Sequence, residues 1–178
     1  MNINKSAINR ISNGITEWQS KKARSEEERW SYDEHEKIME DYEDVLSFAE
    51  NKCGMREIGK GRDRIVFTSG NVVSCKQDVV IKISLSDGTM QNLEEIEMWN
   101  HIEEDVKEHV ASVIDWDENY KWIIQQQADQ GSPPGASKTL LENLSNIGWT
   151  CSDIRPDNVG MIDNKPVLID LGLGLRKK

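Results

Sequence analysis

Apolar residues recur at steps of three and four positions in the first fifty residues of the chain. Six of them have this spacing within residues 3–18, and five more have it within residues 38–49. The period is typical of amphipathic helices and predicts a helix over each stretch, although Gly14 weakens the first. Residues 25–50 contain 11 acidic and two basic side chains. We interpret them as the solvated face of a helix, and a docking surface for a basic partner is the alternative.

The pattern changes at Cys53, where short apolar runs replace the helical period. These runs are rich in Val and Ile, and glycine-containing connections separate the first of them, so we expect strands. One stretch with helical spacing follows the third run, which predicts a sheet with a helix inserted after its third strand. The strands are expected at 56–60, 65–69, 79–84, 110–116 and 121–127, and the helix at 90–106.

A Gly-Ser-Pro-Pro-Gly sequence at 131–135 separates this region from the rest of the chain. Proline and glycine there can neither continue a helix nor pair regularly in a sheet. Leucines with helical spacing follow and predict a helix over 140–147. Two apolar runs, 159–162 and 167–171, flank the turn-forming residues 163–166, which indicates a β-hairpin.

The chain has 178 residues, with 22 basic and 32 acidic side chains and a formal net charge of −10. This acidic excess argues against a nucleic-acid partner, because binding a phosphate backbone requires a surplus of lysine and arginine. No apolar run approaches the roughly 20 residues that span a bilayer, and the first ten residues lack the apolar core of a signal peptide. We therefore expect a soluble, cytoplasmic protein with no membrane association. Three cysteines without CxxC spacing indicate neither a disulfide framework nor a zinc site.

Four groups of residues carry candidate chemistry. Gly59 and Gly61 lie between two predicted strands, where backbone N–H groups could approach an anion, although a plain hairpin turn is an equally good interpretation. Lys82 lies inside an apolar strand, so it either faces water at a sheet edge or needs an anionic partner. Glu95 flanks the apolar stripe of the predicted helix, where a carboxylate needs a cation, and Lys82 is the nearest candidate in the chain.

The fourth group surrounds the C-terminal hairpin. Asp153 and Asn158 lie in a polar turn immediately before the first strand of the hairpin, and Asp170 ends the second strand. The hairpin should bring Asn158 and Asp170 together, and their amide and carboxylate oxygens suit magnesium held with substrate phosphates. Asp153 could orient or deprotonate an attacking hydroxyl.

Taken together, these residues resemble the protein-kinase-like family, and the motifs follow the family's order from about residue 55 to residue 172. Asp153 and Asn158 have the separation of the catalytic-loop Asp and Asn. The remaining matches are Asp170-Leu171-Gly172 at the D-F-G position, Val79-Val80-Ile81-Lys82 at the strand lysine, Gly59 and Gly61 in the glycine-rich loop, and Glu95 at the helix-C glutamate.

The resemblance implies an α+β fold with N-terminal helices, a kinase-like N-lobe (an antiparallel sheet plus helix C) and a reduced C-lobe. The corresponding segments are 1–52, 53–130 and 131–178. ATP and Mg²⁺ are the implied cofactors. The implied catalytic residues are Asp153, Lys82 and Glu95; the nucleotide would contact Gly59, Gly61, Arg64, Lys82, Gln126, Gln127 and Ala128; the metal would be held by Asn158 and Asp170.

The chain also departs from the family pattern. Cys151 replaces the catalytic-loop histidine, the arginine that usually precedes Asp153 is missing, and Leu171 and Arg64 replace a phenylalanine and the third loop glycine. Few residues follow Asp170, so we expect a truncated C-lobe without an activation segment. The apolar surface left by this truncation would be covered by the N-terminal helices, a second copy of the chain or a partner protein.

Three functions remain open at this point. The favoured one is an ATP-dependent phosphotransferase acting on protein Ser or Thr, including its own. The second is a small-molecule phosphotransferase of the aminoglycoside-kinase type, so that the phosphoryl acceptor is either a protein or a small molecule. The third is a non-catalytic nucleotide-binding or inhibitory module, although the retention of all five motif residues argues against it.

Overall fold

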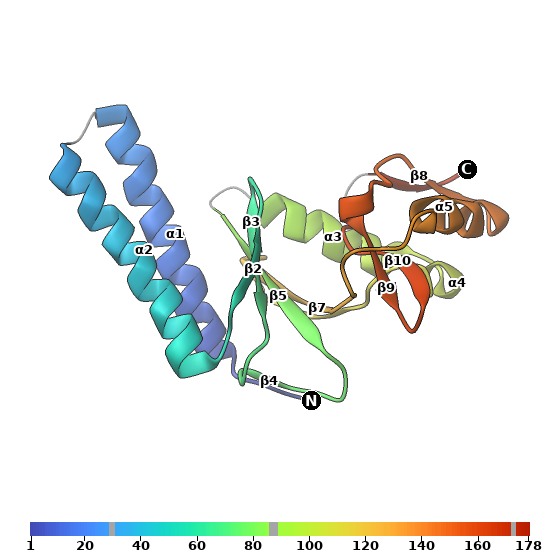
Figure 1. Cartoon of the computed structure of the whole chain (residues 1–178), viewed down its shortest axis with the longest axis horizontal. Helices are drawn as coiled ribbons and strands as arrows, with labels where there is room; N and C mark the ends of the chain where they lie inside the picture. The colour runs from blue at the N-terminus through green and yellow to red at the C-terminus, as the bar shows by residue number, and fades with distance from the viewer. Residues whose placement is uncertain (29–30, 86–88, 172–173) are drawn as a thin grey trace. The chain divides into compact units, whose positions relative to one another are not determined.

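The computed structural model describes residues 1–28, 31–85, 89–171 and 174–178. The chain forms two compact units. Figure 1 shows the chain coloured by residue number. The first unit contains Met1–Met90 with Trp116–Ile124, and the second contains Gln91–Asp115 with Gln125–Lys178. Helices and a five-stranded sheet make up the chain, so the predicted α+β class is confirmed.

Two long helices, α1 (Lys5–Glu28) and α2 (Tyr32–Cys53), pack side by side at the start of the first unit (Figure 1). Both are longer than the apolar period predicts, because α1 continues through polar residues with high helix propensity after its last apolar position. Ser31 and Glu34 form a capping box at the start of α2. Gly54 ends α2 in the left-handed conformation, with φ of 63°.

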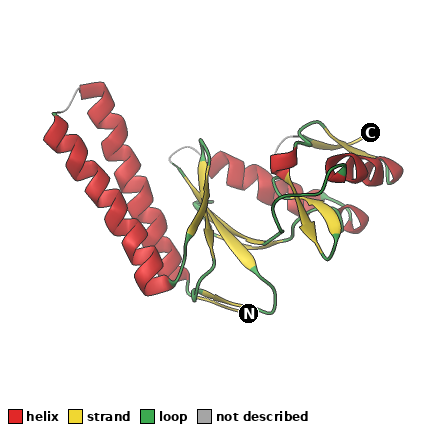
Figure 2. Ribbon diagram, viewed as in Figure 1, coloured by secondary structure: helices red, strands yellow, loops and turns green. Residues whose placement is uncertain are grey.

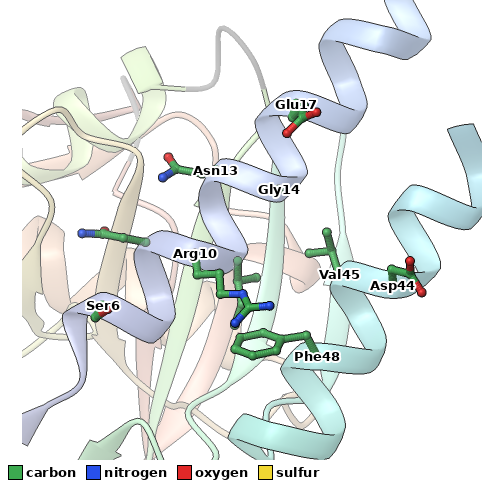
Figure 3. Close-up of a pocket in the computed structure, with 10 residues that line it drawn as sticks. Ser6, Arg10, Asn13, Gly14, Glu17, Asp44, Val45 and Phe48 are labelled. Atoms are coloured by element: carbon green, nitrogen blue, oxygen red, sulfur yellow. The ribbon is translucent and has the colours of Figure 1, made fainter.

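The two helices cross closely at Gly14, the residue that weakens the helical pattern. A Cβ atom at Gly14 would lie 2.6 Å from Cγ2 of Val45, so only glycine allows this approach. The guanidinium of Arg10 on α1 lies 3.9 Å from the ring centre of Phe48 on α2 (Figure 3). These residues line a hollow of about 870 Å³ on the hairpin.

The sheet has the strand order β2-β3-β5-β7-β6, and its first three strands pair in antiparallel fashion. Strand β5 lies in the middle of this order, and all six of its residues are buried. Figure 2 shows the strands in yellow. Their bounds are β2 Glu57–Lys60, β3 Arg64–Thr68, β5 Val79–Ser84, β6 Val113–Trp116 and β7 Trp122–Gln126.

The predicted helix over 90–106 is wrong in one respect, because the chain forms two helices there, α3 (Thr89–His101) and α4 (Glu104–Lys107). Glu103 between them has an extended backbone. Ile102 and Val106, on either side of this break, are both buried. The strand predicted over 110–116 begins only at Val113, although Val110 makes an isolated bridge to Leu168.

The second unit contains the predicted C-terminal helix and hairpin. The hairpin turn places Asp163 and Asn164 at positive φ, a conformation that Asn and Asp tolerate better than other side chains. Two three-residue strands, β8 and β11, pair with each other and were not predicted. The bounds are α5 Ala136–Asn146, β8 Trp149–Cys151, β9 Val159–Ile162, β10 Lys165–Leu168 and β11 Leu175–Lys177.

A short pair of strands, β1 (Asn2–Ile3) and β4 (Val73–Ser74), also lies outside the predicted elements. None of the helices in the described part of the chain has the length and apolar character needed to cross a bilayer.

Candidate functional site

The loop between β8 and β9 is closed by the side chain of Asn158. Its Nδ2 donates to the backbone carbonyl of Asp153 at 3.1 Å and to Oδ2 of the same residue at 2.9 Å. Asn158 is only 8% exposed, so these bonds satisfy a buried amide. Both bonds use the amide nitrogen, so neither uses the amide oxygen of Asn158, an acceptor that could serve as a metal ligand.

Arg155 makes an ion pair with the same aspartate. Its Nε lies 3.0 Å from Oδ1 of Asp153 and 3.8 Å from Oδ1 of Asp157. The side chains of Asp153 and Arg155 are more than half exposed, so the pair contributes little to stability and mainly orients the carboxylate. Arg155 was not among the residues predicted from the sequence; the signal for it is a basic residue two positions after Asp153.

The β9–β10 hairpin brings Asp170 next to Asn158, as the sequence predicts. The backbone N–H of Ile169 donates to the carbonyl of Asn158 at 3.0 Å, and Asp170 is the following residue. Asp170 is half-buried. The second unit therefore assembles Asp153, Asn158 and Asp170 through its own chain.

The chain returns to this loop after Asp170. The N–H of Ser152 donates to the carbonyl of Gly174 at 3.0 Å, and β11 continues the pairing. A Cβ atom at Gly174 would lie 3.0 Å from the backbone nitrogen of Asp153, so glycine permits the close approach. Gly172 of the Asp-Leu-Gly motif lies outside the described residues, and Leu171 is fully buried.

Cys151 stands where the family has its catalytic-loop histidine. It is 7% exposed, and burial raises the pKa of its thiol. A protonated, buried thiol packs like a small apolar side chain and is a poor nucleophile. Cys151 therefore serves packing beside the loop.

Lys82 lies on the central strand β5, in the register position opposite Val66 of β3. It is 6% exposed, so the alternative of a lysine facing water at a sheet edge is wrong. Glu95 on α3 is completely buried, as expected from its place beside the apolar stripe. Its Oε1 accepts a hydrogen bond of 2.9 Å from Nε2 of Gln125, which also donates to the carbonyl of Ala111. The pairing of Lys82 with Glu95 stays a prediction.

The glycine-containing segment forms a hairpin turn between β2 and β3. The N–H of Gly61 donates to the carbonyl of Arg64 at 2.8 Å, which closes the turn. The carbonyl of Asp63 accepts a bond from the N–H of Leu85, so the tip is also tied to the segment after β5. Arg64 is 8% exposed, and its side chain is therefore part of the packed sheet.

Gln126, Gln127 and Ala128 follow the end of the sheet. The N–H of Gln126 donates to the carbonyl of Ser112, and Gln127 is exposed. A Cβ atom at Gly160 would lie 2.6 Å from the Cβ of Ala128, so the segment packs tightly on β9. The boundary between the two compact units falls between Ile124 and Gln125, just before these residues.

Among the residues that the structure describes, no group of three or more His, Cys, Asp and Glu side chains gathers as a metal site. An Asp and an Asn form a smaller set, which suits a cation that also binds phosphate oxygens. No protein-family model matches the chain. No curated protein is detectably similar to it.

Proposed function

We propose that the protein is an ATP-dependent phosphotransferase with a protein-kinase-like fold, acting on protein Ser or Thr and on itself. One observation carries the proposal: Asp153, Asn158 and Asp170 are spaced as in the family's motifs and lie in one neighbourhood, because Asn158 bonds to Asp153 and the N–H of Ile169, the residue before Asp170, donates to the carbonyl of Asn158. The C-terminal hairpin produces this neighbourhood.

The first unit and α3 add further support. A kinase-like N-lobe needs an antiparallel sheet with a helix after its third strand, and α3 follows β5, the third strand of the five-stranded sheet along the chain. The lysine and glutamate of the family motif are both buried, although buried lysine and glutamate are rare. A buried charge has to be paired, so their burial favours a role over chance placement.

Each residue has a separate role in the proposed reaction. The oxygen of Asn158 and the carboxylate of Asp170 would hold Mg²⁺, which when bound neutralises charge on the phosphates of ATP. Lys82, held by Glu95, would bind the α- and β-phosphates through its ammonium group. Asp153 would accept a hydrogen bond from the acceptor hydroxyl and position it for attack. The proposal requires that the two units present these residues to one nucleotide.

Magnesium-dependent ATP turnover and autophosphorylation of the purified chain test the proposal. Asp170→Ala should lower turnover by at least about 100-fold, because charge stabilisation supplies most of the catalysis in phosphoryl transfer. Circular dichroism should show an unchanged fold. Glu142→Ala is the matched control, since it removes an exposed acid from α5 of the same unit and should leave turnover unchanged.

Other outcomes decide between the remaining functions. Full activity of Asp170→Ala would contradict the assignment. ATP binding by the wild-type chain without turnover would select the non-catalytic module. Turnover with small metabolites but not with proteins would select the small-molecule phosphotransferase.

A further inference from the structure

A cluster of four side chains joins the helical hairpin to the glycine-containing turn. Lys60, the last residue of β2, places its ammonium 4.8 Å from the ring centre of Trp18 and 4.2 Å from that of Tyr42. The two rings are stacked, with their centres 4.3 Å apart. The Lys60 ammonium also donates to the hydroxyl of Tyr42 at 3.1 Å, and that hydroxyl donates to Oε2 of Glu57 at 3.0 Å. We refer to Trp18, Tyr42, Glu57 and Lys60 as the Lys60 cluster.

A β-bulge in β2 makes this cluster geometrically possible. Residues three apart in a regular strand point to opposite faces, so Glu57 and Lys60 could not both reach Tyr42. The register shifts between Glu57 and Gly59, and Glu57 pairs with Phe67 while Lys60 pairs with Ile65. Phe67 and Ile65 are two apart and share a face, so their partners Glu57 and Lys60 share it as well.

The hairpin that supplies the two rings is itself firmly placed. Its helices cross at Gly14, and Arg10 on one helix covers Phe48 on the other (Figure 3). Trp122 on β7 donates its Nε1–H to Oδ1 of Asn9 on α1 at 2.6 Å. The N–H of Asn71 donates to the carbonyl of Cys53 at the end of α2. α1 is thus bonded to the sheet, and the end of α2 is bonded to the segment between β3 and β4, both at positions outside the Lys60 cluster.

The hydroxyl of Tyr42 acts as a neutral donor in this arrangement. Burial, followed by the hydrogen bond to Glu57, raises the pKa of Tyr42 above its ordinary value of about 10. Tyr42 is 6% exposed and Trp18 5%, whereas Lys60 and Glu57 are exposed on the strand. The rings therefore form a fixed platform, and the strand residues attach to it.

We infer that the α1–α2 hairpin holds the end of β2 and the turn that begins at Gly61 in place for the phosphates of a nucleotide, with Trp18, Tyr42 and Lys60 as positioning residues. The inference rests on the proposed function. Glycine loses more conformational freedom than other residues when it is ordered. If this turn were unsupported, ordering it on nucleotide binding would cost entropy and lower the affinity for the nucleotide. Because the ammonium of Lys60 is engaged by Trp18 and Tyr42, its role in the proposal is to position the turn and not to bind the phosphates itself.

Two substitutions separate the contacts of the cluster. Lys60→Met removes the ammonium and keeps the aliphatic stem, and Tyr42→Phe removes the shared hydroxyl and keeps the stacked ring. Lys60→Arg retains a cation over the rings and should rescue the wild-type behaviour. Lys52→Met is the matched control, because Lys52 is an exposed lysine in the last turn of α2.

Two measurements on the full chain test the inference. Hydrogen exchange of the backbone amides of residues 57–64 needs no nucleotide and should be about threefold faster in Lys60→Met and Tyr42→Phe. The KM for ATP should rise by about threefold in the same variants, while kcat stays within about twofold of wild type. Lys60→Arg and Lys52→Met should change neither quantity.

The exchange measurement distinguishes failure of the inference from failure of the proposed function. Unchanged exchange at residues 57–64 overturns the inference, whether or not the wild-type chain binds ATP. A fall in kcat at constant KM overturns it as well, because it would place the cluster in the chemical step. Faster exchange in the variants, together with no ATP binding by the wild-type chain, would show that the hairpin holds the turn. It would also overturn the proposed function and the role of the turn in binding phosphates.

Discussion

The two candidate loops of this protein are held in place in different ways. The loop between β8 and β9 is closed by its own residues, since Asn158 bonds back to Asp153 five positions earlier. The turn between β2 and β3 is closed by the N–H of Gly61, and distant parts of the chain hold it through Leu85, which bonds to Asp63, and through Trp18 and Tyr42, which engage Lys60 just before the turn. A loop of the first kind is encoded by local spacing, whereas a loop of the second kind depends on tertiary packing.

This difference predicts how each loop responds to damage. Removing the side chain of Asn158 should strongly disturb the β8–β9 loop, because the backbone bond from Ser152 to Gly174 remains but does not orient the carboxylate of Asp153. Removing one contact from an externally held turn should loosen it only in part, because the turn hydrogen bond and the strand pairing remain.

The largest effect is expected for Asn158→Ala. This change removes both hydrogen bonds to Asp153 and the proposed metal ligand, so turnover should fall by at least about 100-fold. Loss of a buried, bonded amide should also lower the free energy of unfolding by about 1–3 kcal/mol, measurable by urea denaturation. Asn146→Ala, at the exposed end of α5, is the control and should change neither quantity. Normal turnover in Asn158→Ala would break the comparison.

An intermediate effect is expected where the hairpin is fixed to the sheet. Gly70 has φ of 52°, and a Cβ atom there would lie 2.2 Å from the carbonyl oxygen of Cys53. Gly70→Ala should lower the free energy of unfolding by about 3 kcal/mol, because the left-handed backbone is unfavourable for alanine and because its Cβ clashes with the backbone of Cys53. Gly131 also has positive φ, at 86°, but has nothing within 4 Å of a built Cβ, so Gly131→Ala should cost only about 1 kcal/mol. Equal losses in urea denaturation would show that the contact at Gly70 does not anchor the helices.

The smallest effect concerns alkaline pH. The pKa of Tyr42 is raised in the folded protein, chiefly by burial, so folding favours its protonated form. The contribution to stability is full below the unfolded pKa of about 10 and is lost as the pH rises above it toward the folded value. Between pH 9 and pH 11 the unfolding free energy of the wild type should therefore fall more than that of Tyr42→Phe, by up to about 1 kcal/mol. Urea denaturation of both proteins across this pH range measures the difference. Parallel curves for the two proteins would contradict the role of the hydroxyl.

The contrast between locally encoded structure and structure that depends on distant packing also explains which features the sequence could predict. The strand over 79–84, the hairpin strand over 159–162 and the approach of Asp170 to Asn158 follow from local apolar runs and turn residues, and all three are confirmed. The burial of Glu95 also follows from the helical period.

Other features depend on partners far away in the chain. The strand pairs β1–β4 and β8–β11 are two or three residues long, too short to produce a recognisable alternation. The part of α1 after Trp18 has no apolar period, and its residues are held by high helix propensity and by contacts such as the ion pair of Lys21 with Asp41. The Lys60 cluster needs both the hairpin packing and a bulge in β2, and neither has a signal in the local sequence.

A crystal structure of the chain with Mg²⁺ and a non-hydrolysable ATP analogue tests the central claim most directly. The account predicts a metal ion bound by the side-chain oxygens of Asn158 and Asp170, with the ammonium of Lys82 within hydrogen-bonding distance of the α- or β-phosphate. A nucleotide bound elsewhere, or phosphates that contact neither Lys82 nor Asp170, would contradict it.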